Sequence, residues 1–432
     1  MEEKKFETAE SIEESASSGP NPLWTRDFTI LTLGSVVSML GGTLAGFAMS
    51  LLVLDYTGST FYFAIYNIVY FVPYVIMPLV AGPYLDRFSR KRTIYTLDFI
   101  TAGIYGIFSL ILFKGWLNFG ILAAGTFLVG VIGSVYMVAY ESFYPLLITP
   151  GNFSKAYSVA STLETLTMVM VPVSAFLYNT IGIAPLFAIN VVTYGIAAVF
   201  ETQIKQEEKY IAKRAAESAE EAKAGLKRFL DDFREGMTYL KSEKGLLAVA
   251  IYFLFSSIAD GGGQTVTLPY FKSAFPNGEY IYIVVFGCMS AARALGGVFH
   301  YRHRLPVDKK YDIAFFVYIV INVLSAVYLY LPVPPMAVCC AIVGVLGMTS
   351  YNIRISATQR YVPDEKKGRF NGAFNTLSMI GMLTGQALAG LLSLKFPLRP
   401  IFTAINLVCL AAALIFIGGN REEISKVYNT QD

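Results

Sequence analysis

Long apolar runs, separated by short polar intervals, fill most of the chain between residues 28 and 418. A helix needs about 20 mostly apolar residues to cross roughly 30 Å of hydrocarbon. Twelve runs meet that requirement: Phe28–Leu54, Phe61–Val80, Thr93–Phe113, Leu117–Tyr144, Ala156–Tyr178, Ala184–Phe200, Leu246–Leu268, Tyr280–Phe299, Asp312–Tyr330, Pro334–Ser356, Gly368–Leu394 and Pro400–Gly418. They are about twice as long as barrel strands and do not alternate. The pattern therefore predicts an all-α membrane protein with twelve transmembrane helices.

Composition excludes a soluble protein of this length. Of the 432 residues, 55% are apolar and only 15% are charged, and the mean hydropathy is +0.52. A soluble domain carries roughly a quarter charged residues. The four cysteines all lie inside apolar runs, which argues against a disulfide framework. The polar, acidic start of the chain also lacks the features of a cleavable signal peptide.

Basic residues predict how the helices cross the membrane. Of the 34 Lys and Arg residues, 23 fall in the loops that are cytoplasmic if the N-terminus is cytoplasmic. The opposite loops contain only Lys114, Lys272, Lys395 and Arg399. Because cytoplasmic loops carry the excess of basic residues, we expect a multi-pass plasma-membrane protein with both termini in the cytoplasm.

The two halves of the chain resemble each other at an offset of 213 to 216 residues. Pro150 aligns with Pro363, Arg87 aligns with Arg302, and the tripeptide Ala-Ile-Asn recurs after 216 residues. Such internal repeats are common in transporters. The sequence therefore predicts two pseudo-symmetric six-helix halves within five segments: a polar tail (1–24), the N-terminal half (25–201), a linker (202–245), the C-terminal half (246–418) and a second tail (419–432).

The linker contains one amphipathic helix. Its apolar residues recur at steps of four and three, which places them on one helical face: Leu226, Leu230, Phe233, Met237 and Leu240. We expect this helix to lie against the cytoplasmic side of the protein and to connect the two halves.

The loop between the second and third runs reads GPYLDRFSRKR from Gly82 to Arg92. It resembles the signature loop of the major facilitator superfamily, with Ser89 in place of the usual glycine. Further similarity at Asp55–Ser59, Asp98 and Tyr144–Leu147 looks like the drug/proton antiporter branch, which contains macrolide efflux proteins and the enterobactin exporter. The glycine-rich motif that such antiporters carry in span five is reduced here to VPVS, which weakens the case for antiport.

The resemblance implies a fold of twelve helices and transport by alternating access. It also implies that the loop acts as a gate, through Gly82, Asp86, Arg87, Arg90 and Lys91. A carboxylate such as Asp86 is favoured at the N-terminus of a helix, and we expect it to approach the start of span eleven. The alternative is a solvated basic loop that only sets topology, and both descriptions suit Lys91.

Six ionisable residues are predicted to lie at membrane depth, where a charge is costly and suggests function. They are Asp98, Glu141, Glu164, Asp260, Arg293 and Arg354. We expect Asp98 to be a structural partner of the signature loop rather than a substrate ligand. For Asp260 and Glu164 we favour the binding of a proton or another cation. Arg293 fits equally well a functional site and a side chain that snorkels to the interface.

Glu141 and Arg354 are related by the repeat offset of 213 residues. In the superfamily that this chain resembles, spans one, four, seven and ten line the central cavity. One hypothesis is therefore a gate in which Glu141 pairs with Arg354, and the other is a permanent pair between Glu141 and Arg90.

The remaining candidates suggest an aromatic, weakly polar cavity. Three glycines follow Asp260, which makes a local break in span seven plausible, although small residues also serve close helix packing. The expected cavity lining is Tyr136, Tyr140, Tyr252, Gln264, Tyr351 and Asn352. Such a lining suits a bulky amphipathic solute, including a cation held by ring faces.

These patterns favour proton-coupled efflux of a small amphipathic compound, such as a drug or a siderophore-like molecule. A proton-coupled importer of an organic acid is the alternative, and a membrane sensor ranks below both. We expect no enzyme activity, metal site, cofactor or nucleic-acid partner. The only histidines, His300 and His303, lie in a basic loop without other metal ligands. The expected partners are the solute, protons and membrane lipid, and the expected state is a monomer.

Overall fold

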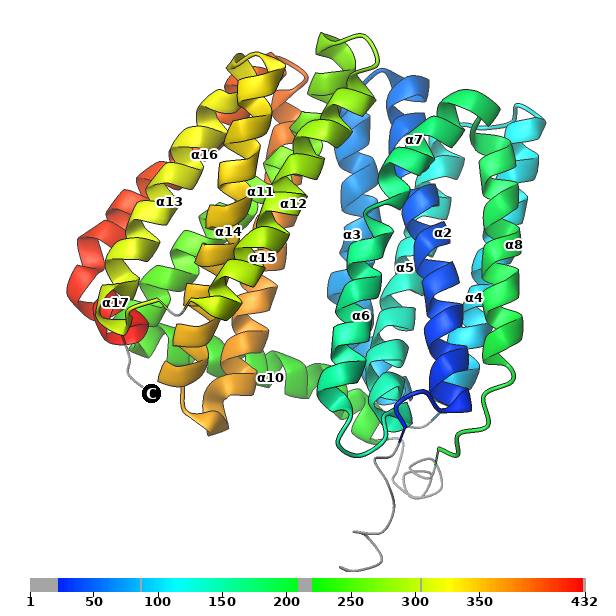
Figure 1. The fold of residues 1–432 in the computed structure, drawn as a ribbon, viewed down its shortest axis with the longest axis horizontal. Helices are drawn as coiled ribbons and strands as arrows, with labels where there is room; N and C mark the ends of the chain where they lie inside the picture. The colour runs from blue at the N-terminus through cyan, green and yellow to red at the C-terminus, as the bar shows by residue number, and fades with distance from the viewer. Residues whose placement is uncertain (1–21, 86–87, 209–219, 304, 430–432) are drawn as a thin grey trace, which may run out of the picture. The chain divides into compact units, whose positions relative to one another are not determined.

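The computed structural model describes residues 22–85, 88–208, 220–303 and 305–429, and these ranges contain helices and no strands (Figure 1). The helices of the first six runs are α2 (Arg26–Thr57), α3 (Thr60–Leu85), α4 (Arg90–Phe113), α5 (Phe119–Phe143), α6 (Phe153–Thr167), α7 (Met170–Ile181) and α8 (Ile183–Glu201). Those of the last six are α11 (Lys244–Ala274), α12 (Gly278–Arg302), α13 (Lys310–Val327), α14 (Val333–Tyr361), α15 (Asp364–Leu392) and α16 (Leu398–Ala412). The all-α fold predicted from the apolar runs is confirmed.

The fifth run forms two helices instead of one. Helix α6 ends at Thr167, and α7 begins at Met170 after a turn at Met168 and Val169. Pro172 has no N–H group to bond the carbonyl four residues earlier, which in a helix is that of Met168. Proline therefore accounts for the interruption that the apolar pattern did not indicate.

The last run continues past its predicted end. Helix α16 passes into a π-helical turn at Ala413–Ile417, and a short helix, α17 (Arg421–Tyr428), follows. Ile424, Val427 and Tyr428 are buried, and the Tyr428 hydroxyl lies 2.8 Å from that of Tyr318. Part of the segment predicted as a polar tail is therefore packed on the core.

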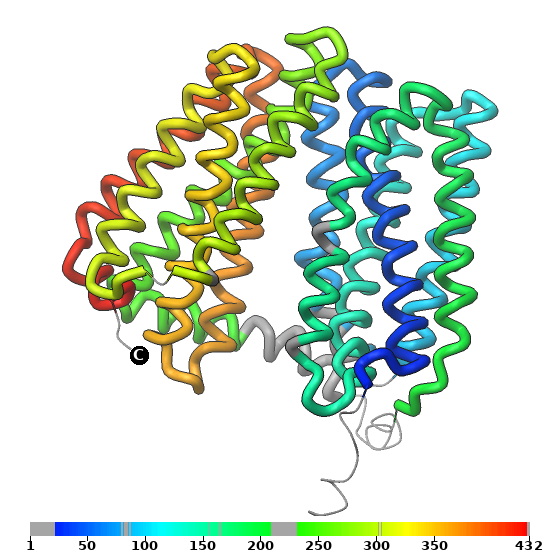
Figure 2. The backbone as a smooth tube through the Cα atoms, viewed as in Figure 1, coloured from blue at the N-terminus to red at the C-terminus, as the bar shows by residue number. Residues whose placement is uncertain are grey.

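The chain divides into two compact units. The first comprises Met1–Ala48, Tyr84–Trp116 and Ile132–Glu217, and the second comprises Met49–Pro83, Leu117–Val131 and Ser218–Asp432. Within the described part of the first unit, α4 packs along α8. Within the second, α11 packs along α15 and α12 packs along α14 (Figure 2).

Glycines permit the closest of these helix contacts. A Cβ atom at Gly261 of α11 would collide with the Met382 carbonyl of α15, and one at Gly385 would collide with the Ile258 carbonyl. Helix α11 runs without a break from Lys244 to Ala274. The local break proposed after Asp260 is therefore wrong, and close packing through small residues explains the glycines of span seven.

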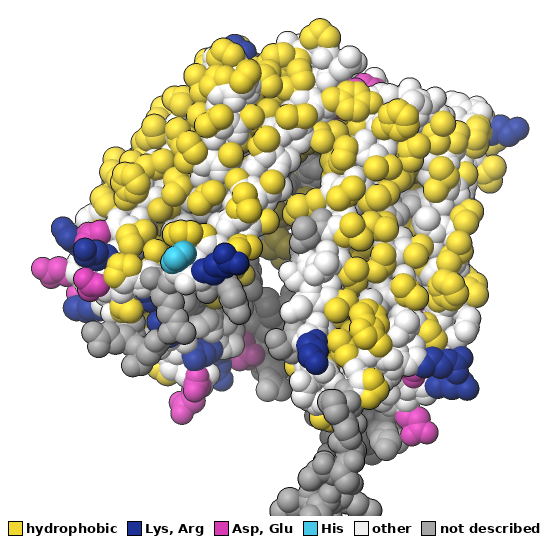
Figure 3. All heavy atoms as spheres, viewed as in Figure 1, with side chains coloured by type: hydrophobic (Ala, Val, Ile, Leu, Met, Phe, Trp, Pro, Cys, Tyr) yellow, Lys and Arg dark blue, Asp and Glu magenta, His cyan; other side chains and the backbone are white. Residues whose placement is uncertain are grey.

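The surfaces of the helices suit a lipid environment. Ten helical segments in the described part of the chain are long and apolar enough to cross a membrane. In the face shown in Figure 3, hydrophobic side chains cover the lengths of the helices and charged side chains gather near helix ends. Large apolar side chains are widely exposed, among them Trp116 (69%), Leu295 (68%) and Leu110 (65%). The chain is a multi-pass membrane protein.

The linker contains helix α10 (Glu220–Ser242), as expected from its apolar stripe. Leu240 is fully buried, and Phe233 and Met237 pack against the same core. The side chains of Leu226 and Leu230 lie outside the described residues. Gly236 approaches the backbone of Arg369 so closely that a Cβ atom would collide with it. Helix α10 is thereby fixed on α15.

Candidate functional site

The signature loop joins the end of α3 to the start of α4. Gly82 lies in the last turns of α3, while Asp86 and Arg87 lie outside the described residues. Ser89 is the N-cap of α4, and its hydroxyl accepts a hydrogen bond from the Arg92 N–H at 3.1 Å. Serine is among the preferred N-cap residues, so the departure from the usual glycine has a structural use.

Glu208, from the beginning of the linker, also caps α4. Its carboxylate accepts a hydrogen bond from the Arg90 N–H at 2.8 Å and another from the Ser89 hydroxyl. A carboxylate is favoured at this position by the partial positive charge of the helix N-terminus. The Lys91 ammonium donates to the carbonyls of Ile204 (3.1 Å) and Gln206 (3.3 Å). The segment that follows α8 is thus fixed on the loop predicted to act as a gate.

Asp98 is buried inside the first unit, about two turns from the start of α4. It is 2% exposed, and its Oδ2 atom accepts a hydrogen bond from the Ser38 hydroxyl of α2 at 2.7 Å. Its described partner is therefore a serine on another helix. The predicted role as a partner of the signature loop has no described contact to support it.

Glu201 is an acidic neighbour of Asp98, and it was absent from the predicted site. It is the last residue of α8, is 0% exposed, and acts electrostatically on Asp98. Neither of its carboxylate oxygens has a hydrogen-bond partner. We refer to Asp98 and Glu201 as the carboxyl pair.

A sequence signal for Glu201 does exist. Asn190, Ala197 and Glu201 are spaced by seven and four residues, which places them on one helical face, and all three are buried. The predicted run ended at Phe200, so that Glu201 fell at the boundary and was not counted as an intramembrane charge.

Three tyrosines form a ladder in the first unit, two of them on α5 and the third, Tyr144, at the start of the 3-10 turn Tyr144–Leu147 that follows it. The ring centroids of Tyr136 and Tyr140 are 6.1 Å apart, and those of Tyr140 and Tyr144 are 5.4 Å apart, with nearly parallel planes. The Tyr136 hydroxyl is buried, lacks a hydrogen-bond partner, and acts on the carboxyl pair. We refer to Tyr136, Tyr140 and Tyr144 as the tyrosine ladder, and its Tyr136 end lies beside the carboxyl pair.

Asp260 and Arg293 come together in the second unit. Asp260 of α11 has an exposed side chain, and the charge of Arg293 of α12 acts on it. The exposed Arg293 side chain thus has an acidic neighbour. Gln264, one turn after Asp260, contacts α15, since its Oε1 accepts a hydrogen bond from Gln386 at 3.4 Å.

Arg354 is held by aromatic rings of its own unit. Its Cζ atom lies 4.7 Å from the ring centroid of Phe374, 4.9 Å from that of Phe253 and 5.7 Å from that of Tyr351. The Arg354 Nε atom is buried without a hydrogen-bond partner. Glu141 is exposed on α5 in the first unit, and its pairing with Arg354 or with Arg90 stays a prediction.

The other predicted residues have diverse surroundings. Tyr351 is 44% exposed and Asn352 is half-buried, whereas Tyr252 is only 3% exposed. The Tyr252 ring packs 4.4 Å from Tyr318, so it belongs to the core and not to an open surface. Glu164 lies on α6, with its side chain outside the described residues.

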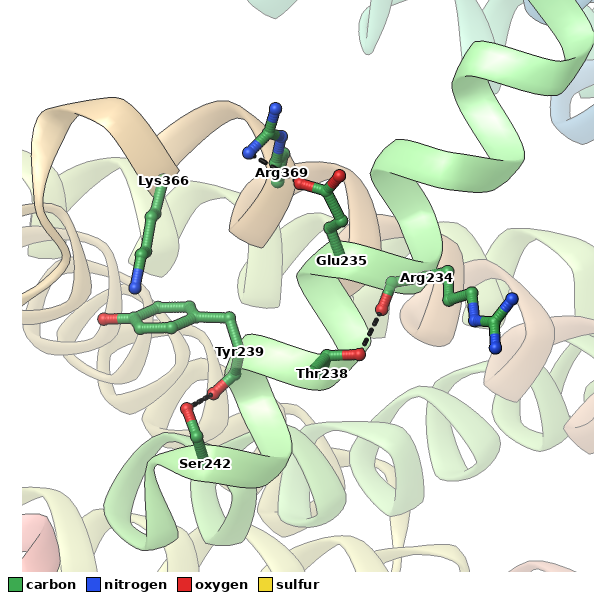
Figure 4. Close-up of a pocket in the computed structure, with 7 residues that line it drawn as sticks. All are labelled: Arg234, Glu235, Thr238, Tyr239, Ser242, Lys366 and Arg369. Carbon is green, nitrogen blue, oxygen red and sulfur yellow. Dashed lines mark hydrogen bonds and ion pairs between the residues drawn. The ribbon is translucent and has the colours of Figure 1, made fainter.

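A pocket of about 380 Å³ lies between the linker helix and the start of α15 (Figure 4). Arg369 spans it, with ion pairs to Glu235 (2.6 Å) and Asp232 (3.2 Å). The Lys366 ammonium lies 4.5 Å from the Tyr239 ring centroid. Burial is the main cause that raises the pKa of Tyr239, and the negative charge of Glu243 adds to it. Most of the charged groups that line this pocket contact one another or an aromatic ring. The pocket therefore belongs to the contact that holds the linker helix on α15, and not to a ligand site.

Comparison with known proteins identifies the family. The profile described as the Major Facilitator Superfamily matches residues 31–385. Members of that family are transporters and not enzymes.

Curated relatives are similar at low identity. The chain is 20% identical to Macrolide efflux protein A of Streptococcus pyogenes over 406 residues, which cover 91% of this chain and 95% of that protein. It is 26% identical over 241 residues to YkuC of Bacillus subtilis (strain 168), described as an uncharacterized MFS-type transporter. That match spans 55% of each chain, so it covers about half the length of the relative.

Solved structures of transporters share the fold. A bacterial homologue of the iron transporter ferroportin, in an inward-facing state, has a TM-score of 0.68 and 14% identity, with 94% of this chain and 99% of that chain covered. The nucleoside transporter NupG has a TM-score of 0.60 and 14% identity, with 90% and 98% covered. At these identities the similarity concerns the fold alone.

Proposed function

Because the chain belongs to the major facilitator superfamily, we propose that it exports a small amphipathic compound in exchange for protons. Export is supported by the similarity to Macrolide efflux protein A, which extends over nearly the full length of both proteins. Alternating access then brings the compound from the cytoplasmic side to the outside.

The tyrosine ladder supports an amphipathic substrate. Tyr136 and Tyr140 of α5 are partly buried and stack in a row, while Tyr144, just beyond the end of α5, is buried and donates its hydroxyl to the Ala156 carbonyl at 2.7 Å. Tyrosine rings offer apolar contact area together with a polar end, and their faces attract cations. A compound with an apolar body and an amine is the class that we propose.

The carboxyl pair is the observation that carries the proton coupling. Asp98 and Glu201 are buried in membrane-spanning helices, and neither pairs with a cation among the described residues. An uncompensated buried charge costs several kcal/mol. A proton removes that cost, so the binding and release of a proton provides a means to couple a gradient to transport.

Uptake of an organic acid is a second candidate, which Arg354 favours. Its guanidinium lies among three aromatic rings and keeps an unbonded Nε atom. A carboxylate is the natural ligand of a desolvated guanidinium. In this case the substrate would move inward with the proton.

We further propose that the protein acts as a monomer in the plasma membrane with both termini in the cytoplasm. The concentration of Lys and Arg in one set of loops supports this orientation. Accessibility of single cysteines introduced at the two ends of the chain would test it, in a background where Cys288 and the other native cysteines are replaced.

Accumulation assays would test the function. Cells with and without the protein are loaded with a panel of fluorescent amphipathic amines and macrolides, and retention is measured before and after a proton uncoupler. We expect lower retention in cells that contain the protein, and loss of this difference when the uncoupler is added. Inverted vesicles with an acidic interior should accumulate the same compounds. Uncoupler-sensitive uptake of organic acids into intact cells, with no change in the retention of amines or macrolides, would favour the importer instead.

A further inference from the structure

Glu201 is completely buried, and its carboxylate forms no hydrogen bond of good geometry, although the Tyr136 hydroxyl acts on it. Its side chain is 0% exposed, and both carboxylate oxygens lack a hydrogen bond. Buried polar groups in proteins are nearly always hydrogen-bonded. A buried carboxylate whose two oxygens form no hydrogen bond is therefore expected to bind a ligand.

The fold makes room for this side chain. A Cβ atom at Gly34 of α2 would lie 3.0 Å from both Cγ and Oε1 of Glu201, closer than ordinary contacts. Farther along the same helix, a Cβ atom at Gly41 would lie 2.6 Å from Asn190 and Thr193 of α8. The glycine face of α2 thus allows α8 to approach and encloses the Glu201 carboxyl group.

The surroundings of the carboxyl pair contain acids and hydroxyls. Helix α4 contributes Asp98, α5 contributes Tyr136 and Tyr140, and these are the titratable groups that act on Glu201. Helix α2 contributes Ser38, bonded to Asp98, and Ser35, whose buried hydroxyl acts on Tyr136 and Tyr140. No Lys, Arg or His of the described residues pairs with either acid.

We propose that Glu201 is a proton-binding residue, which holds its proton in the enclosed conformation while Asp98 carries the negative charge of the pair. A proton from water binds one Glu201 oxygen and forms an O–H bond there, which changes the net charge of the carboxyl pair from −2 to −1. Asp98 is the acid that accepts a hydrogen bond from Ser38, and a hydrogen bond to the ionised form stabilises it. Glu201 is acted on by the Tyr136 hydroxyl but has no bond of comparable geometry, so the proton is held there.

Other ligands fit the pair poorly. Metal sites in proteins usually take several acidic or other strong ligands, and no group of three or more His, Cys, Asp or Glu side chains that could hold a metal ion lies among the described residues. The enclosure by Gly34 leaves little space beside the carboxyl group for an organic cation. A proton needs only one lone pair and no additional volume.

The position of the pair indicates where the proton enters and leaves. Glu201 ends α8, and the next residues are fixed on the start of α4 through the bonds from Lys91 to Ile204 and Gln206. Release of this segment would open the carboxyl group to water at that end of the helices. The proton site is thus adjacent to the signature loop whose movement is expected to accompany transport.

Infrared spectroscopy tests the site without a substrate, which matters because the assignment rests on the proposed proton coupling. The protein in lipid vesicles is titrated with pH, and the C=O stretch of protonated carboxylic acids is followed. We expect a band that persists at neutral pH in the wild type and is absent in Glu201→Gln. Asp98→Asn should keep the band, because Glu201 remains buried without a cation.

Asp312→Asn provides the matched control, since Asp312 is exposed and paired with Arg421 at 3.0 Å. It should leave the neutral-pH band unchanged. A band that survives in Glu201→Gln, or that disappears only in Asp98→Asn, would overturn the assignment. If the band depends on Glu201 but efflux proves insensitive to the uncoupler, the proton site stands and the proposed coupling fails. If efflux is uncoupler-sensitive and no band depends on Glu201, the coupling stands and this site fails.

Discussion

Ser38 and Asp98 lie 60 residues apart in sequence, yet the serine hydroxyl donates a hydrogen bond of 2.7 Å to the Asp98 carboxylate inside the first unit. This bond distinguishes Asp98 from Glu201, whose oxygens form no hydrogen bond of good geometry although the Tyr136 hydroxyl acts on them. Two acids of the same chemical type therefore differ in their ability to hold a charge.

The size of this effect is measurable in Ser38→Ala. A hydrogen bond to an ionised group contributes about 1.5–3 kcal/mol, whereas one between neutral groups contributes about 1 kcal/mol. Because we assign the charge to Asp98, we expect a loss in the larger range, measured by reversible unfolding in mixed micelles. Thr162→Ala, which removes a hydroxyl bonded only within its own helix, is the control. A loss no larger than that of the control would contradict an ionised Asp98.

Replacement of Glu201 should separate coupling from folding. Glu201→Gln keeps the volume of the side chain but cannot exchange a proton, so uncoupler-sensitive efflux should fall to the level of cells without the protein. Exchange of labelled for unlabelled substrate needs no net proton movement and should continue. Equal loss of efflux and exchange would indicate a damaged structure and not a lost proton site. Asp312→Asn should preserve both activities.

Much of the fold follows from the length and periodicity of the apolar runs, and the exceptions have local causes. Pro172 divides span five because it removes one backbone donor, an effect that mean hydropathy does not record. Glycines beside Asp260 suggested a break, but they face the carbonyls of α15 across a continuous helix. Glycine can serve either a flexible break or close helix packing, and only the position of the neighbouring helix shows which of the two applies.

The contacts of the site residues were less predictable than the fold, because the sequence does not show which side chains of different helices meet. Asp98 was recognisable as an intramembrane acid, but its bond to Ser38 depends on how α2 and α4 pack. Glu201 was missed through the uncertainty of one residue in where a span ends. Arg354 was recognisable as a buried charge, while its three aromatic neighbours come from α11, α14 and α15.

The cap that Glu208 places on α4 should stabilise the signature loop. Glu208→Gln keeps an oxygen acceptor but removes the charge that the helix N-terminus favours, so we expect a loss of about 0.5–1 kcal/mol. Amide hydrogen exchange should become faster at Arg90 and Lys91, whose backbone N–H groups donate to this carboxylate. Glu207→Gln, at an exposed neighbouring position, should change neither quantity. Unchanged exchange in Glu208→Gln would show that the cap contributes nothing.

The aromatic surroundings of Arg354 should favour arginine over lysine. A planar guanidinium stacks on ring faces in a way that an ammonium does not, and each desolvated contact of this type contributes roughly 1–2 kcal/mol. We therefore expect Arg354→Lys to destabilise the protein by about 1–2 kcal/mol in micelle unfolding. Arg421→Lys is the control, because Arg421 is exposed and lies near one ring only. Equal effects of the two variants would contradict a role for the rings.

The glycine contacts between α11 and α15 should be intolerant of even one methyl group. Alanine at Gly385 would place its Cβ against the Ile258 carbonyl, and neither backbone can yield without separating the helices. Overpacking of this kind costs typically about 1–3 kcal/mol, so Gly385→Ala should lower the unfolding midpoint clearly. Gly287 lies in α12 with open space around its Cα atom, and Gly287→Ala should be neutral or stabilising by up to about 1 kcal/mol, because alanine is the better helix former. A similar response at both positions would mean that helix propensity, and not the contact between α11 and α15, requires the glycine.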